Sequence, residues 1–481
     1  MARLNPFKAK SRRDDDDDDE DQGLEIDGNT VAGGGHSALP TDITQHHLRV
    51  SRALKSFLAH QGVLSEDDAQ GLQALLDKPV ISPPAHLFDR SHPLPEYFIS
   101  SSHNTYLMAH QLFGTSSAGA YETTLRAGAR CIEIDACAPV RKKGHEEQKA
   151  VRLDELGSKI AVIVEYHLPD EVETQAAPRD AYKAKKKAAP PPIIVPELAE
   201  LGVYAQSVKP RDASWYVEGK IKDGPLEHHL INISESGLAS HTAEHAAEIA
   251  RHNTHHLMRV FPKGTRISSR NLSPIPFWAV GAQICALNWQ TFGAGMQLND
   301  ALFAGSAGYV LKPASLRSGG SGTPILDAPR KILRLQVAGA SDVPLPKGRE
   351  VKDLKPYLTC TLLQPGGGAE LIKAKRKTAA YHQRKVVTLP FLGSVGGKGE
   401  NPAETDPVWD ETLEWEFEDN ELVFLRMFIK SDDSFSSNPI LAVAAVRLLY
   451  VEPGWRFVRM LDLKGHETSC SLLVKFDIQN R

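Results

Sequence analysis

The spacing of hydrophobic positions changes twice along the chain. Between residues 43 and 77, apolar residues recur with helical spacing, as at Leu54 and Leu58, which predicts two amphipathic helices. Across residues 94–317, short apolar runs alternate with helical patterns, which is typical of an α/β fold with parallel strands. From Arg330 onward, apolar and polar residues alternate with period two between turn-rich segments, which predicts a β-sandwich.

The middle region contains six apolar runs that we expect to be strands, at residues 97–102, 131–135, 160–164, 231–234, 284–289 and 308–312. Helical patterns lie between several of them, as at residues 118–127 and 242–253. Residues 173–192 are rich in Ala, Lys and Pro and are expected to be a flexible linker. The glycine-rich residues 318–324 mark the boundary before the sandwich.

Composition refines this organisation. A chain of 481 residues suggests about three domains, and 41% hydrophobic with 24% charged residues is ordinary for a soluble protein. The 56 Lys and Arg residues against 60 Asp and Glu argue against a dominantly basic nucleic-acid binder. The acidic run at residues 14–21 predicts a solvated, disordered tail, and the lysines of residues 183–187 offer only non-specific attraction to nucleic acid.

Cysteine use and targeting signals point to a reducing compartment. The five cysteines form no CxxC pair, which argues against a zinc ribbon. The N-terminal residues lack the apolar core of a signal peptide, and no run reaches the ~18 apolar residues of a membrane span. We therefore expect a soluble, cytoplasmic protein whose contact with membranes is peripheral.

Candidate chemistry follows the first strand of the middle region. His103 and Asn104 come directly after the run 97–102, and the carboxyl end of a strand is the active-site face of a parallel barrel. Glu133 and Asp135 lie two residues apart in a strand pattern, so both face the same way. Such a pair is stabilised either by a hard cation such as Ca²⁺, with Asn104 as a neutral ligand, or by a salt bridge to Arg or Lys.

These segments resemble the X region of the eukaryotic, fungal-like phosphoinositide-specific phospholipases C. The resemblance rests on YFISSSHNTYL at 97–107, YETTLRAGAR at 121–130 and CIEID at 131–135. Four later segments resemble the Y region of that family and occur in the same order. They are RHN at 251–253, RVFPKGTR at 259–266, QICALNWQT at 283–291 and GYVLKP at 308–313. The sandwich resembles the C2 domain that follows in this family, so the resemblance covers residues 43–481.

The resemblance implies a split TIM-like (β/α) barrel, made of X and Y halves and here incomplete, followed by a C2 β-sandwich. A short helical, EF-hand-like segment comes first; it has no DxDxDG calcium loop, and no PH-like domain precedes it. The predicted divisions are the acidic tail 1–42, the helical segment 43–90, the truncated X region 94–172, the linker 173–192, the Y region 193–317 and the C2 domain 326–481.

Family membership implies Ca²⁺-dependent hydrolysis of phosphatidylinositol 4,5-bisphosphate to diacylglycerol and inositol 1,4,5-trisphosphate, in lipid signalling at a membrane surface. The inositol 2-hydroxyl attacks the phosphorus, and two histidines with one Ca²⁺ stabilise the charge on the phosphoryl oxygens. The residues that match the family's functional positions are His103 (catalytic), Asn104, Glu133 and Asp135 (Ca²⁺ ligands), and Asn232, Arg259 and Phe261 (substrate binding). For Asn232 and Phe261, core packing is the alternative.

The chain departs from the family after Asp135. Residues 136–148 lack the segment with the second catalytic histidine, and His145 has the wrong neighbours to replace it. The following strand, with the fourth Ca²⁺ ligand, is also missing, and Ile163 and Glu165 stand where two phosphate-binding lysines are expected. Outside the linker the barrel region has roughly 200 residues, whereas a full barrel takes ~250. Either an exon is missing from the sequence, or the protein is a catalytically inactive, phospholipase-like membrane-binding scaffold.

The sandwich carries acidic residues at loop positions that resemble the Ca²⁺ ligands of C2 domains, namely Asp353, Asp406 and Asp433. Ser431 and Pro439 stand where further acids are expected. A purely structural C2 domain that packs on the barrel is therefore the alternative to a second Ca²⁺ site.

Overall fold

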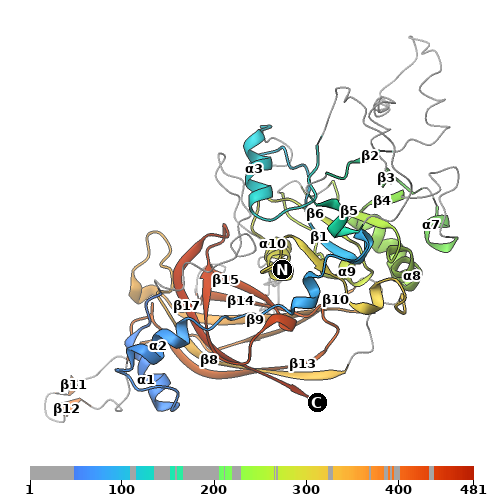
Figure 1. The fold of residues 1–481 in the computed structure, drawn as a ribbon. Helices are drawn as coiled ribbons and strands as arrows, with labels where there is room; N and C mark the ends of the chain where they lie inside the picture. The colour runs from blue at the N-terminus through green and yellow to red at the C-terminus, as the bar shows by residue number, and fades with distance from the viewer. Residues whose placement is uncertain are drawn as a thin grey trace, which may run out of the picture.

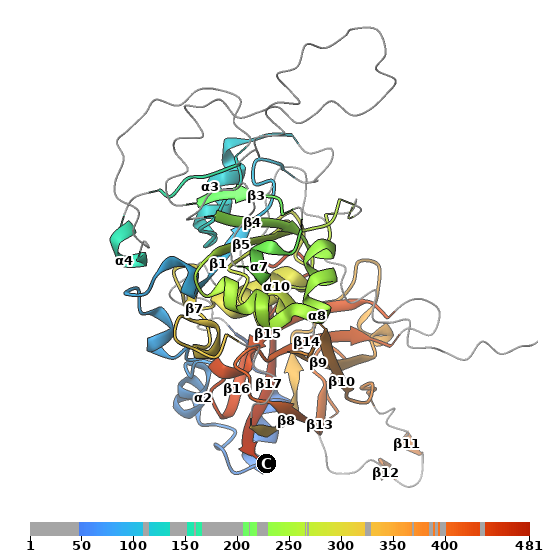
Figure 2. The ribbon, with the colours of Figure 1, turned by 90° about the vertical axis from the view of Figure 1, so that its right-hand side faces the viewer.

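The computed structural model describes residues 48–108, 115–134, 152–157, 160–165, 205–210, 212–218, 229–264, 266, 269–322, 329–367, 370–383, 388–389, 393–394, 401–432 and 438–481. The predicted acidic tail, residues 1–42, and the predicted linker, residues 173–192, lie outside them. An α/β unit lies against an antiparallel β unit, and two N-terminal helices lie beside the latter (Figures 1 and 2).

The α/β unit is built on a seven-stranded sheet. Its strands lie in the spatial order β2 (Ile163–Glu165), β3 (Ala205–Val208), β4 (His229–Ser234), β5 (Leu257–Phe261), β6 (Ile284–Leu287), β1 (Tyr97–Ser102) and β7 (Tyr309–Leu311). All neighbours from β2 to β1 are parallel, as the alternation of strands and helices predicted. β7 is antiparallel to β1, contrary to the predicted parallel arrangement, because a short apolar run specifies a strand but not its direction.

Successive side chains of each strand point to opposite faces of the seven-stranded sheet. The inner face carries an apolar cluster that includes Ile99, Leu230 and Leu257. The opposite residues, such as Ile231 and Met258, pack under helices. The helices of this unit are α3 (Ala118–Arg126), α4 (Leu153–Leu156), α7 (Ser214–Val217), α8 (Glu235–Asn253), α9 (Ile275–Ala279) and α10 (Ala294–Phe303), with the 3₁₀ turns η5 (Ala85–Phe88), η6 (Leu94–Glu96) and η7 (Ala314–Leu316).

Within the described residues the sheet does not close into a barrel. β2 pairs with β3 alone, and the segment after α3 joins β1 through a single parallel bridge between Ser101 and Cys131. No described strand connects β2 to that bridge. The opening agrees with the incomplete barrel expected from the sequence, because strand number and closure of a barrel are linked.

The β unit is a curled antiparallel sheet of eight strands. Their spatial order is β10 (Leu371–Lys377), β9 (Pro356–Pro365), β14 (Phe424–Ser431), β15 (Ile440–Arg447), β16 (Gly454–Leu461), β17 (Glu467–Asn480), β8 (Arg330–Ser341) and β13 (Val408–Glu418). β15 and β16 share one paired position, Val443 with Leu461, so the sheet folds there into two layers of four strands. Trp415 Nε1 of β13 donates to Ala374 O of β10 over 2.8 Å and ties the two ends together. The predicted sandwich is therefore confirmed.

The strand β14 shows why the two units adhere. All eight of its residues are buried, although an exposed sandwich strand normally alternates. Phe424 and Phe428 pack with Trp278 of α9 in a cluster shared with the α/β unit, whereas Met427 and Ile429 face the core between the sandwich layers. One strand thus supplies side chains to two hydrophobic cores.

The first helices cover the sandwich and not the sheet of the α/β unit. α1 (Arg52–His60) is capped by Ser51, whose side chain accepts a hydrogen bond from the backbone N–H of Leu54, and α2 (Ala69–Leu76) follows. Phe57 meets Trp455 of β16 edge to face, with ring centroids 5.5 Å apart. The remaining elements are η8 (Val351–Asp353), η10 (Leu448–Tyr450), and the short pair β11 (Thr388–Leu389) and β12 (Gly393–Ser394). None of the described helices is long and apolar enough to cross a membrane.

Asp300 of α10 gives the fold a testable pH dependence. Burial raises the pKa of this carboxyl to about 7, against a smaller lowering by Asn299, and its Oδ2 has no partner among the described residues. The folded chain therefore keeps a proton that the unfolded chain releases near pH 4, so the free energy of unfolding should fall as pH rises from about 4 to about 7.

Asp300→Asn should flatten that decline and raise stability above pH 7, measured as urea unfolding at several pH values. The exposed Asp67→Asn is the matched control. An unchanged pH slope in Asp300→Asn would contradict the assignment.

Candidate active site

Four parallel strands aim polar side chains at the carboxyl end of the inner face. Period two places Asn232 of β4 and Arg259 and Phe261 of β5 on the same side as the apolar inner cluster. His103 continues the inner face of β1, and Asn288 continues that of β6. The predicted His103, Asn104, Glu133, Asn232, Arg259 and Phe261 are linked to one another here by hydrogen bonds or ring contacts.

His103 is held in one orientation from two sides. Its Nδ1 lies 2.9 Å from Oδ1 of Asn288, and its ring stacks on Phe261 with an interplanar angle of 5° and centroids 6.3 Å apart. The Asn288 amide donates from Nδ2 to Arg270 O, so Oδ1 is the atom that accepts from His103. The Nδ1 of His103 thus carries a proton, and Nε2 is the ring nitrogen that can exchange a proton with a substrate.

Arg259 lies at the centre of the group. Its Nη2 donates to Glu133 Oε2 over 2.6 Å, and its Nη1 donates to Asn232 Oδ1 over 3.0 Å. The guanidinium carbon lies 5.5 Å from the centroid of the Phe261 ring. The Arg259 side chain is 11% exposed and that of Glu133 is 29% exposed, so the cation is almost buried and depends on its partners.

Glu133 is fixed by the loop after β1. Asn104 adopts a left-handed conformation, with φ of 45°, and its backbone N–H donates to Glu133 Oε2 over 2.8 Å. Thr105 Oγ1 accepts from the backbone N–H of Glu133 over 3.0 Å. Of the two partners that the sequence left open for Glu133, the described contacts contain the salt bridge, to Arg259.

The donor set also fits a calcium ion. Asn104 and Glu133 are in contact and both offer side-chain oxygen, the ligand type that Ca²⁺ prefers. The predicted third ligand, Asp135, lies outside the described residues, as does His145. Within the described part of the chain, two of the predicted calcium ligands are thus adjacent.

Three contacts of this site were not predicted from the sequence. Asn288 orients His103, Thr105 holds the Glu133 backbone, and the Tyr121 hydroxyl donates to Glu133 O over 3.2 Å. Asn288 had a usable signal, because it follows an apolar strand just as His103 does. The other two have ordinary surroundings in the sequence and are recognised only by their contacts.

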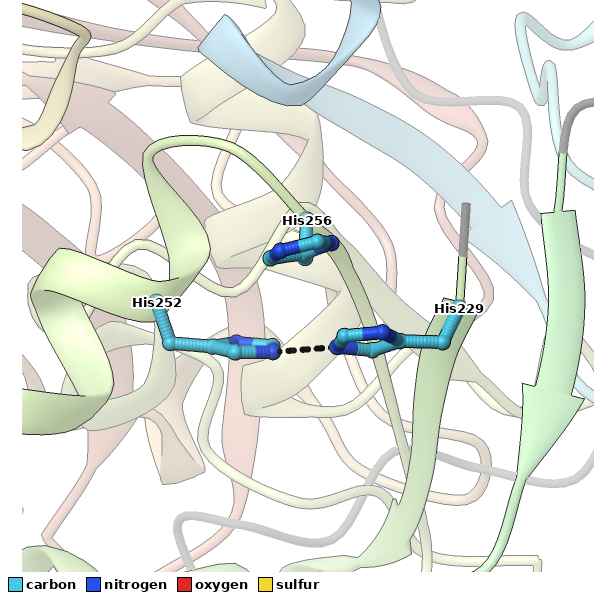
Figure 3. A group of neighbouring side chains, drawn as sticks. All are labelled: His229, His252 and His256. Atoms are coloured by element: carbon cyan, nitrogen blue, oxygen red, sulfur yellow. Dashed lines mark hydrogen bonds between the residues drawn. The ribbon is translucent and has the colours of Figure 1, made fainter. Parts of the chain in front are cut away.

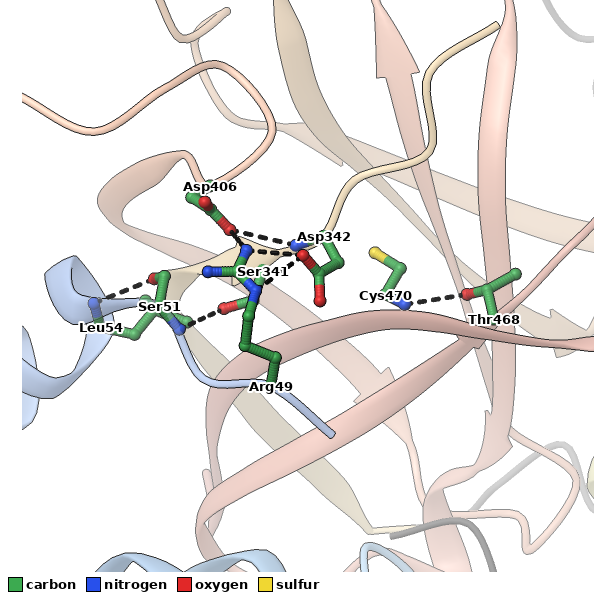
Figure 4. A network of polar contacts seen from close by, with 8 residues as sticks. All are labelled: Arg49, Ser51, Leu54, Ser341, Asp342, Asp406, Thr468 and Cys470. Carbon is green, nitrogen blue, oxygen red and sulfur yellow. Dashed lines mark hydrogen bonds and ion pairs between the residues drawn. The ribbon is translucent and has the colours of Figure 1, made fainter. Parts of the chain in front are cut away.

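The acidic residues predicted as C2 calcium ligands are found in different settings. Asp406 Oδ1 accepts a hydrogen bond from Asp342 N over 3.1 Å and forms an ion pair with Arg49 (Figure 4). The Arg49 guanidinium also contacts the Asp342 carboxylate. Asp353 is exposed and accepts from Glu350 N over 3.1 Å. Asp433 lies outside the described residues. The ion pair with Arg49 favours a structural role for the Asp406 carboxylate.

Comparison with known proteins relates the α/β region of the chain to a known family. Residues 90–198 match the model of the phosphatidylinositol-specific phospholipase C X domain, and residues 198–315 match the model of the Y domain. The structure resembles the crystal structure of L. pealei PLC21 with a TM-score of 0.64 at 19% sequence identity, over 87% of this chain and 60% of that one. That likeness concerns the fold.

Two curated relatives illustrate the range of similar proteins. The Mus musculus 1-phosphatidylinositol 4,5-bisphosphate phosphodiesterase delta-3 is 27% identical over 82% of this chain and 58% of its own length. The Homo sapiens inactive phospholipase C-like protein 2 is 25% identical over 84% of this chain and 42% of its own length. The chain thus spans about half the length of the curated relatives it matches. The two matches thus identify residues 90–315 as the X and Y regions of a phosphatidylinositol-specific phospholipase C.

Proposed function

We propose that this protein is a Ca²⁺-dependent phosphoinositide phospholipase C that hydrolyses phosphatidylinositol 4,5-bisphosphate to diacylglycerol and inositol 1,4,5-trisphosphate in lipid signalling. The observation that carries the proposal is the convergence of His103, Glu133, Asn232 and Arg259 at the carboxyl end of the parallel strands. That end of a β/α sheet is where active sites of this architecture are built.

Arg259 is suited to bind phosphate. A guanidinium offers paired N–H donors that match phosphate oxygens, and here it is preorganised by Glu133 and Asn232. Phe261 provides the apolar ring face beside it, against which the inositol ring packs. Substrate phosphate competes with Glu133 for Arg259, so binding releases the carboxylate from its ion pair.

His103 stabilises the reacting phosphoryl group. With Nδ1 held by Asn288, the protonated ring donates from Nε2 to a phosphoryl oxygen as the 2-hydroxyl attacks phosphorus and the diacylglycerol oxygen leaves. Water takes up the proton of the 2-hydroxyl and supplies one to the leaving oxygen. A second water molecule then opens the cyclic phosphate to give inositol 1,4,5-trisphosphate. Asn104 and Glu133, with Asp135, are the residues that would hold Ca²⁺. When bound, Ca²⁺ supplies Lewis-acid stabilisation of the phosphoryl oxygens and lowers the pKa of the attacking hydroxyl.

The substrate is a membrane lipid, so the protein works in the cytoplasm at a membrane surface. The sandwich is the proposed membrane-facing C2 domain, and phosphoinositide lipid is the proposed partner. Within the described residues, no helix provides a membrane span.

A second candidate function is a catalytically inactive, membrane-binding scaffold. It is favoured by the open edge between β2 and Cys131, where the sequence lacks the strand with the fourth Ca²⁺ ligand and the segment with the second histidine. In this case Arg259 and Phe261 still bind an inositol phosphate headgroup, but no turnover follows.

The test is hydrolysis of phosphatidylinositol 4,5-bisphosphate in mixed vesicles by the purified full chain, with Ca²⁺ titrated from a chelated start. Glu133→Gln should raise the Ca²⁺ concentration for half-maximal activity by about 10-fold or more, because a ligand loses its charge. The exposed Glu122→Gln on α3 should leave it unchanged. Vesicle binding without any hydrolysis by the wild-type chain would establish the scaffold and overturn the enzyme.

A further inference from the structure

Three histidines meet on the side of the sheet away from the candidate active site. His229 is the first residue of β4, His252 lies in the last turn of α8, and His256 precedes β5 (Figure 3). His229 precedes Asn232 by three residues of the same strand, which is about 10 Å, and it points to the helix-covered face. The cluster is therefore separate from the phosphate-binding group.

The three imidazoles are packed closely enough to share one ion. One ring nitrogen of each lies within 4.8 Å of those of the other two. His229 Nε2 and His252 Nε2 are 2.9 Å apart, and the His256 ring stacks over His229 with centroids 4.0 Å apart (Figure 3). His229 is 2% exposed and His252 is 6% exposed, whereas His256 is half-buried and lies on the solvent side.

The hydrogen bonds around the cluster define where the protons lie. Asn253 Nδ2 donates to Val280 O over 2.8 Å, so its Oδ1 accepts from Nδ1 of His252 at 3.0 Å. Nε2 of His252 then carries a lone pair and accepts from Nε2–H of His229. The remaining lone pair of His229, on Nδ1, is buried and has no partner among the described residues.

This arrangement has features of a metal site before a metal enters. A metal-ligating histidine usually donates its second ring N–H to a fixed acceptor, as His252 does to Asn253. The carboxyl end of α8 supplies the negative end of a helix dipole next to His252.

A lysine, Lys312, lies beside the histidine cluster, and its Nζ donates to Asn253 O over 2.9 Å. Burial lowers the pKa of Lys312 well below its usual value.

We propose that His229, His252 and His256 bind a divalent transition-metal ion of the Zn²⁺ class, as a structural clamp between β4, α8 and β5. Three imidazole nitrogens suit such an ion and not Ca²⁺, which prefers oxygen. Zn–N bonds of ~2.0–2.1 Å put tetrahedral nitrogens roughly 3.3 Å apart, so the His229–His252 contact opens slightly and the His256 ring turns edge-on. The proton of His229 moves from Nε2 to Nδ1, which leaves a lone pair on Nε2 for the metal. Water takes the fourth position on the solvent side.

The test is Zn²⁺ binding to the full chain after chelator treatment, measured by equilibrium dialysis in excess Ca²⁺ so that the oxygen ligands of the active site do not contribute. The wild-type chain should bind about one equivalent of Zn²⁺. So should the control His255→Ala, which removes an exposed histidine beside the cluster. His252→Ala and His256→Gln should lose this Zn²⁺ or bind it at least about 10-fold more weakly. Co²⁺ should give the visible absorption bands of a tetrahedral nitrogen site in the wild-type chain and in His255→Ala, but not in the other two variants.

His256→Gln keeps the test valid if a buried substitution unfolds the chain, because His256 is half-buried. Its folding is checked by thermal unfolding in chelator, and Zn²⁺ should raise the unfolding temperature of the wild-type chain but not of this variant. Equal Zn²⁺ stoichiometry and affinity in His255→Ala and His256→Gln would overturn the site.

Discussion

Replacement of His103 by alanine is expected to lower the rate of phosphatidylinositol 4,5-bisphosphate hydrolysis by roughly 10²–10⁴-fold. The ring is the group at the carboxyl end of β1 that is oriented by a hydrogen bond to Asn288 and a stack on Phe261. Alanine removes the proposed proton donor to the phosphoryl oxygen but leaves Arg259 and its partners in place. The measurement is initial-rate hydrolysis in vesicles at saturating Ca²⁺, with vesicle binding recorded in parallel.

Two variants make this result specific. His60→Ala removes an exposed histidine at the end of α1 and should keep full activity. Asn288→Ala removes the acceptor of Nδ1 and should lower activity less than His103→Ala, while shifting the pH profile, because the ring then loses its fixed tautomer. Full activity in His103→Ala would refute the proposed role of this side chain.

Trp278→Ala is expected to lower the free energy of unfolding by roughly 3–5 kcal/mol. This α9 side chain is 1% exposed and lies between Phe98 of β1 and Phe424 of β14, with ring centroids 6.1 and 5.9 Å away. The cavity opens in the core that joins the α/β unit to the sandwich, so both units lose packing. Urea unfolding followed by fluorescence and by circular dichroism measures the loss.

The exposed Val217→Ala is the control, since Val217 is 63% exposed and a surface truncation changes stability by no more than about 0.5 kcal/mol. Trp278→Phe should fall between wild type and Trp278→Ala, because a ring remains between Phe98 and Phe424. A Trp278→Ala chain as stable as the control would show that the two units do not depend on this contact.

The predictions from the sequence were strongest where periodicity and motifs coincide. The strand 97–102, the helix near 118–127 and the sandwich strands all follow from local spacing and agree with the structure. The expected strand 131–135 is less regular: among its described residues, 131–134, only Cys131 forms a bridge, to Ser101 of β1.

The candidate site shows the same division. His103, Asn104, Glu133 and Arg259 could be named from their positions after or within strands, since period two fixes the direction of each side chain relative to its own strand. Their mutual contacts could not be named, because the pairing of Arg259 with Glu133 joins residues 126 positions apart. The choice between a calcium ligand and a salt bridge for Glu133 also depends on that distant neighbour.

By itself, the sequence determined the fold class, the order of the units and the chemical types of the candidate site residues, because these follow from local periodicity and short motifs. The tertiary structure alone decided that β7 runs antiparallel and that Arg49 pairs with Asp406. It also alone brought His229, His252 and His256 together. The physical reason is that hydrogen bonds and ion pairs act over a few ångströms in space, and only folding brings distant residues that close.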